Sequence, residues 1–249
     1  MYFRNIEDYG ICEREKMKKV KIFKLSYLIM LIAFRMFSAE INFSELVKSS
    51  TDFIEVTEPV ILSENISLDS KQSLSIRGQG KIISRNDVAL SINGSFTADC
   101  RQVFENFSPG KVKFAKGSVM QAYPQWWGAA ANAKVDDSLA LQAAIDSGVM
   151  RISVPQGFYL LQKTINITNR PFGLIIEGNG MSEAGTVFLG DAGDIVFDTS
   201  GSRYLDFKNF RIAAGSNNPA TIGILYARTK TVKFVEFNKI SDVAISLPS

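Results

Sequence analysis

Carboxylates are the residues of this sequence best placed to do chemistry. Five of them follow short apolar segments in the second half of the chain: Asp191, Asp194, Asp198, Asp206 and Glu236. Two carboxylates about 6.5–9.5 Å apart can hydrolyse a glycosidic bond, one donating a proton and the other activating water. A base beside Ca²⁺, Arg or Lys could instead cleave a uronate sugar by elimination. We take Asp191, Asp194, Asp206 and Glu236 as catalytic candidates, with solvated turn residues as the simpler alternative.

Several other site types are excluded or weakened by composition. Histidine is absent from the 249 residues, which excludes Ser-His-Asp catalysis, His-Glu-x-x-His zinc sites and imidazole acid–base chemistry. The segment 190–194 has loop composition but lacks the alternating oxygen ligands of an EF-hand. We therefore predict no metal site and no evident cofactor, with Ca²⁺ considered only if the protein is a lyase. Cys100 is expected to be a packed, inert thiol.

Trp126 and Trp127 are the candidate sugar-binding residues, because aromatic faces pack well against the apolar C–H surface of a sugar ring. The alternative, which we favour, is that both rings pack the junction between the preceding β segment and the following helix.

A short helix is predicted at about residues 137–147. Its apolar face comprises Ala140, Leu141, Ala144 and Ile145, and its polar face comprises Ser138, Gln142 and Asp146. Asp136 and Asp137 are placed to accept from the first N–H groups of the helix. Gly148 can end it in the left-handed conformation.

Short apolar alternations separated by turn residues indicate β structure on both sides of this helix. From residue 53 to residue 114 they predict one or two β-coils, or a separate small β-domain. Ile66, Leu68, Leu74, Ile76, Gly78 and Gly80 recur as Ile165, Ile167, Leu174, Ile176, Gly178 and Gly180. Because helix signals and a third glycine are missing, we interpret the glycine pairs as tight corners, not dinucleotide sites.

A second recurrence predicts coil stacking in the last part of the chain. Leu205, Phe207 and Phe210 recur 27 residues later as Val232, Phe234 and Phe237. Inward side chains of successive coils would then stack on like neighbours about 4.8 Å apart. No coil can bury its own apolar face, so stacking must supply the stability.

The segment 123–161 carries a motif of well-defined spacing. Its elements are Trp127-Gly128-Ala129, Asp136-Asp137, Ala140, Gln142, Ala144-Ile145-Asp146, Pro155, Gly157 and Tyr159. They resemble the N-terminal portion of the pectate-lyase-like superfamily, which includes rhamnogalacturonase- and epimerase-like proteins and phage tailspike-type proteins. The sequence departs from that pattern with Asn132-Ala133 in place of Asp-Gly and with Val135, Ser138 and Leu141.

The resemblance implies an all-β fold, a right-handed single-strand parallel β-helix with a short N-terminal capping helix. It also implies a polysaccharide lyase or glycoside hydrolase acting on an extracellular or capsular glycan. A non-catalytic, adhesin-like β-helix that binds glycan is the alternative, as is a truncated fragment without an active site. Fold is a poor guide to chemistry, so both remain open.

Charge and targeting signals bound the partners and the location. Residues 40–249 hold 20 basic and 21 acidic residues, a balance that argues against nucleic-acid binding. Residues 1–39 are interpreted as a mis-assigned start followed by a signal peptide beginning at Met17, which predicts a secreted, cell-surface or periplasmic protein. The apolar run is too short for a membrane span.

The remaining chain divides into an N-terminal β segment, 40–122, and the motif-bearing domain, 123–249. No closing helix or polar coil follows the last apolar segment. We therefore expect the domain to be truncated at its C-terminal end, or its open end to be covered by another subunit.

Overall fold

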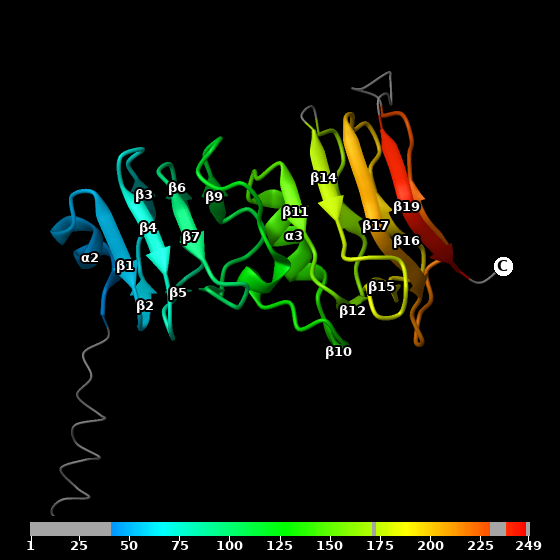
Figure 1. The fold of residues 1–249 in the computed structure, drawn as a ribbon, viewed down its shortest axis with the longest axis horizontal. Coiled ribbons are helices and arrows are strands. Elements are labelled where there is room, and N and C mark those ends of the chain that lie inside the picture. The colour runs from blue at the N-terminus through cyan, green and yellow to red at the C-terminus, as the bar shows by residue number, and fades with distance from the viewer. Residues whose placement is uncertain (1–40, 171–172, 230–237, 248–249) are drawn as a thin grey trace, which may run out of the picture. The chain divides into compact units, whose positions relative to one another are not determined.

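Figure 1 shows the protein as a computed structural model, which describes residues 41–170, 173–229 and 238–247. Residues 41–249 form one compact unit. The predicted start at Met17, the signal peptide and Glu236 lie outside the described residues.

The first half of this unit is a short helix followed by nine strands. They are α2 Phe43–Ser49, β1 Phe53–Val56, β2 Pro59–Leu62, β3 Ile66–Leu68, β4 Ser73–Ile76, β5 Lys81–Ser84, β6 Leu90–Ile92, β7 Phe96–Ala98, β8 Phe104–Glu105 and β9 Val112–Phe114. Every third strand returns to the same sheet, giving the parallel orders β1-β4-β7, β2-β5-β8 and β3-β6-β9. Three turns of chain, each of three strands, are therefore stacked before the motif-bearing segment.

The second half begins with a 3-10 helix and continues mostly as strands. Its elements are η1 Pro124–Trp127, β10 Asn132–Asp136, α3 Ser138–Asp146, β11 Arg151–Ser153, β12 Gly157–Leu161, β13 Ile165–Asn166, β14 Leu174–Glu177, β15 Thr186–Gly190, β16 Ile195–Asp198, β17 Leu205–Ala214, β18 Ile222–Leu225 and β19 Lys239–Ser246. β13, β16 and β18 form one parallel sheet. The other strands form a seven-stranded sheet with the order β10-β12-β15-β17-β14-β11, in which β19 also pairs with β17.

β17 joins the two halves of this larger sheet because it is long enough to pair twice. Leu205–Lys208 pairs with β14, and Arg211–Ala214 pairs with β15. All the described strand pairs are parallel. The protein is thus an all-β protein built from parallel sheets, with α2 and α3 as its described α-helices.

The interior is a continuous apolar core that extends from Phe43 to Ala220. Phe43 belongs to α2, an N-terminal helix that the sequence analysis missed. Asn42 caps this helix, since its side-chain oxygen accepts from the Ser44 N–H at 2.9 Å. Glu45 stands in the first turn, where a carboxylate is favourable. The two features were visible in the sequence as Asn-x-x-Glu.

The predicted helix at 137–147 is present as α3, and Gly148 follows it with a φ of +90°. Its predicted apolar face is buried. Ser138 of the predicted polar face is buried as well. Its hydroxyl donates to Asp136 Oδ1 and accepts from the Lys163 N–H at 3.0 Å, so local hydrogen bonds compensate the burial.

The glycine pairs do form corners after matching strands, β4 and β14. In each pair one glycine has a positive φ and the other lies against a neighbouring turn. A Cβ on Gly80 would lie 2.0 Å from the Val56 carbonyl oxygen, and one on Gly178 would lie 2.3 Å from that of Asn209. The close approach of backbone to backbone therefore excludes any side chain at these two positions.

The stacking partner predicted for Phe207 was wrong. Phe207 pairs with Ile176 of β14 on one side and with Ile240 of β19 on the other, whereas Phe234 lies outside the described residues. A 27-residue offset does occur elsewhere, between Ile195 of β16 and Ile222 of β18. The sequence offset between paired strands therefore varies along the chain, and no single period describes it.

Candidate functional site

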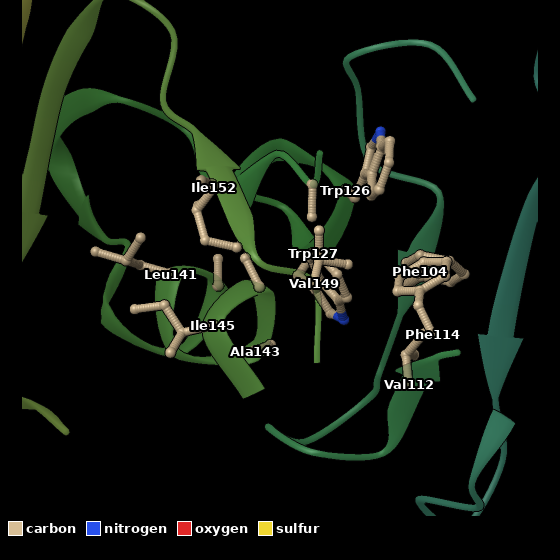
Figure 2. Close-up of a cluster of buried hydrophobic side chains, with 14 of the residues drawn as sticks. Phe104, Val112, Phe114, Trp126, Trp127, Leu141, Ala143, Ile145, Val149 and Ile152 are labelled. Atoms are coloured by element: carbon tan, nitrogen blue, oxygen red, sulfur yellow. The ribbon is translucent and has the colours of Figure 1, made fainter. Parts of the chain in front are cut away.

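Trp126 and Trp127 lie inside the junction between the first three turns and α3. Figure 2 shows Trp127 and Val149 between the side chains of α3 and those of Phe104 and Phe114. The exposed fractions are 2% for Trp126 and 8% for Trp127. Trp126 meets the Phe96 ring edge-on, and its indole N–H donates to the Asp99 carbonyl at 3.0 Å. Neither indole offers an open face to a sugar.

The two carboxylates before α3 have different tasks. Asp136 Oδ1 accepts from the Ser138 N–H at 3.0 Å, which answers one of the first N–H groups of the helix. Asp137 makes no cap. Its buried carboxylate instead accepts from the N–H groups of Ala130 at 2.7 Å and Ala131 at 3.1 Å, one on each oxygen. Burial raises the pKa of Asp137, and these two backbone donors oppose the shift.

Replacing Asp137 with asparagine is expected to lower the free energy of unfolding by about 1–3 kcal/mol. Asparagine would remove the cost of burying a charge. It has only one acceptor oxygen, however, so its NH₂ group would face the N–H of Ala130 or Ala131 without a hydrogen bond. Asp136→Asn is the matched control, because the hydrogen bonds that Asp136 accepts from Ser138 and Gln162 all end on Oδ1, and an amide oxygen can replace that atom. Urea unfolding of both variants checks this, and equal losses would contradict it.

The catalytic candidates after α3 each have their own environment. Asp191 is 4% exposed and accepts from the N–H groups of Asn217 and Asn218 at 2.8 and 2.7 Å, and from the Asn217 side chain at 3.1 Å. These bonds, the Asn218 N–H first, hold the pKa of Asp191 below its usual value. Asp191 therefore stabilises the conformation of residues 215–218, and few of its lone pairs remain free to bind a substrate.

The other candidates are distributed over separate strand ends. Asp194 is exposed, and its main-chain carbonyl accepts from Thr221 and Ile222. Asp198 accepts from the Ser200 N–H at 2.9 Å. Within the described ranges, the buried oxygen Oδ1 of Asp206 has no hydrogen-bond partner. Burial, followed by the Asp206 charge, raises the pKa of Tyr226 to about 12.

No group of three Cys, Asp or Glu side chains is placed to hold a metal ion in the part of the chain that the structure describes. The described catalytic candidates thus form no acidic cluster. Asp194 fits the simpler alternative, a solvated turn residue. Asp191 instead stabilises a turn through its hydrogen bonds.

A hollow of about 550 Å³ with polar and apolar lining residues lies instead on the outer face of α3, and we call it the α3 hollow. It is lined by Ser138, Leu139, Gln142, Ile145, Asp146, Lys163, Thr164, Asn166, Ile167, Thr168 and Arg170. Gln142 fixes one wall, because its amide accepts from the Asn166 N–H at 2.8 Å and donates to the Asn166 carbonyl at 2.9 Å. Helix and corner therefore hold the hollow in a defined shape.

Asp146 and Arg170 set the electrostatics of this hollow. Asp146 Oδ1 accepts from the Gln142 amide at 3.1 Å, and burial raises the pKa of Asp146 against the opposing effects of Gln142, Lys113 and Arg170. Arg170 donates to the Ile145 carbonyl at 3.2 Å, near the negative end of the α3 dipole. Lys163, which is exposed, also lines the hollow. The hollow thus joins one protonatable carboxylate with two cations.

Lys163 and Arg170 were not among the predicted site residues. They come from the segment around β13 and line the same hollow as Asp146 because that corner packs beside α3. Cys100 was also mis-assigned, since it is an exposed thiol rather than a packed one. Its Sγ contacts Gln125 Oε1 at 3.9 Å, and local desolvation raises its pKa.

Among the described residues, no helix has the length and apolar character needed to cross a membrane. Comparisons with family models, with curated proteins and with solved structures gave no match.

Proposed function

We propose that this chain is a right-handed parallel β-helix of the pectate-lyase-like kind and that it binds an acidic extracellular polysaccharide in the α3 hollow. The fold proposal is supported by the parallel pairing, the return of the chain to the same sheet every third strand, and the motif at residues 123–161. The binding proposal rests mainly on one observation, the polar lining of the α3 hollow.

The chemistry of that lining suits an acidic sugar. Hydroxyl and amide groups of Thr164, Thr168 and Asn166 can exchange hydrogen bonds with sugar hydroxyls. Lys163 and Arg170 supply positive charge for a uronate carboxylate. A volume of about 550 Å³ is within the usual range for ligand sites.

Binding is favoured over cleavage because hydrolysis needs two carboxylates that face each other. Asp146 is the one carboxylate among the described residues that line the α3 hollow. A lyase or hydrolase remains the second candidate, since the raised pKa of Asp146 suits a general acid. The predicted signal peptide supports export, and N-terminal sequencing of the secreted protein tests that step.

Replacing Lys163 with glutamine is expected to weaken binding of uronic-acid oligosaccharides about fivefold, which corresponds to losing one exposed charge pair of about 1 kcal/mol. The effect should shrink at high salt, because exposed charges are screened. Lys134→Gln is the control, since Lys134 is exposed on β10 outside the hollow. Titration calorimetry against uronic-acid and neutral glycans measures both.

Equal affinity for neutral and uronic-acid glycans, or equal losses in the two variants, would overturn the binding proposal. The same incubations separate binding from cleavage. New reducing ends would identify a hydrolase, and new unsaturated ends would identify a lyase.

A further inference from the structure

A second hollow of about 720 Å³ shares Asp146 and Arg170 with the α3 hollow, but Lys163 does not line it. Its walls are the turn that follows β9 and the turn that follows α3, so it occupies the outer end of the same junction that Trp126 and Trp127 fill inside. We call it the junction hollow. Its volume is within the range of small-molecule sites.

The apolar part of this hollow is made of two methionines and two valines. Met120 is 93% exposed and Met150 is 52% exposed, while Val119 and the buried Val149 complete the lining. A single exposed apolar side chain is ordinary on a protein surface. Two methionines that line one hollow are a different case, because the flexible thioether side chain adapts to apolar ligands of varied shape.

The polar part of the junction hollow is basic. Lys113, Lys116 and Arg170 line it, and Asp146 is the one carboxylate among its described lining residues. Two of the cations are held by the end of α3. Lys113 Nζ donates to the Asp146 carbonyl at 2.5 Å, and Arg170 donates to the Ile145 carbonyl. Lys116 is exposed. The hollow therefore presents an excess of positive charge beside an apolar wall.

We propose that the junction hollow binds a small amphipathic carboxylate, with its anionic head near Lys116 and Arg170 and its short alkyl chain against Met120, Met150 and Val149. The positive charge of the hollow favours an anionic head group, and the exposed methionines favour an apolar alkyl chain. This proposal does not rest on the proposed glycan site, although Asp146 and Arg170 line both hollows.

Octanoate is the probe. Acetate is a control that has the carboxylate but no alkyl chain, and 1-octanol is a control that has the alkyl chain but no charge. The protein is labelled with ¹³C at its methionine methyl groups, and the ligands are titrated by NMR. We expect octanoate to shift the Met120 and Met150 signals in a saturable way, and acetate and 1-octanol to bind at least about tenfold more weakly. Assignment uses Met120→Leu and Met150→Leu variants.

Lys116→Gln is expected to weaken octanoate binding about fivefold, the effect of one exposed charge. Lys163→Gln is the matched control, because Lys163 lines only the α3 hollow, and it should leave octanoate binding unchanged. No saturable shift, equal binding of either partial ligand, or an equal loss in both lysine variants would overturn the proposal. Glycan binding measured on Lys116→Gln distinguishes the two sites, since it should stay at the level of the unchanged protein.

Discussion

Replacing Trp126 with alanine is expected to lower the free energy of unfolding by about 3–5 kcal/mol, the range found when a buried aromatic side chain is removed. The side chain is almost fully buried, and its ring packs against Phe96, Phe114 and Tyr123 with centroid separations of 5.0, 6.0 and 5.5 Å. Alanine would leave a cavity in the junction between the first three turns of the chain and α3. Urea unfolding followed by circular dichroism measures the loss.

Trp126→Phe separates the two contributions of this residue. Phenylalanine keeps much of the ring packing but removes the indole N–H, which donates a hydrogen bond to the Asp99 carbonyl. We expect it to cost about 1–3 kcal/mol, less than the alanine variant, since one acceptor is left unsatisfied. Because the indole lies inside the junction, the folded Phe variant should bind glycan with unchanged affinity. A selective loss of affinity with normal stability would instead support the sugar-stacking role.

Local features of the structure could be predicted from the sequence wherever neighbouring residues determine them. α3 follows from apolar spacing, and Gly148 marks its end, because both signals act within one or two turns of helix. The glycine corners were recognisable for a similar reason. Asp136 and Asp137 were equivalent by position, however, and only the fold of the 128–131 segment gives Asp137 its two N–H partners.

Coil register could not be predicted because the turns absorb variable numbers of residues. Loops that differ by several residues cost little, so consecutive coils need not share one length. Phe207 illustrates the consequence. A fixed offset between similar side chains predicts Phe234 as its partner, whereas the sheet pairs Phe207 with Ile240. Stacking requires an apolar neighbour of suitable size, and any aliphatic side chain can fill that role.

The candidate site was missed because it is formed by segments far apart in the sequence. Choosing carboxylates by type favoured Asp191, which the structure uses to fasten a turn. Asp146 carried a stronger signal. It is an acidic residue in the last turn of a helix, where the negative end of the helix dipole disfavours a negative charge. That signal indicates a nearby cation, but the sequence does not reveal that Lys113 and Arg170 supply it.

Replacing Phe207 with alanine is expected to lower the free energy of unfolding by about 3–5 kcal/mol. Phe207 is buried and lies between Ile176 of β14 and Ile240 of β19 in the sheet, with the Phe197 ring centroid 5.6 Å from its own. Lys208→Ala is the control on the next position of the same strand. Its ammonium lies 3.3 Å from Glu177 on a partly exposed surface, so its loss should cost about 1 kcal/mol or less.

A double-mutant cycle then tests the stacking itself. If Phe207 stabilises the protein through contact between coils, the losses of Phe207→Ala and Ile176→Ala should not add, and the coupling should be about 0.5–3 kcal/mol. Additive losses would mean that each side chain is stabilised within its own coil. A loss below about 1 kcal/mol for Phe207→Ala alone would contradict its interior position. Stability that depends on pairs from successive coils is the property that distinguishes a stack of turns from a core closed by distant segments.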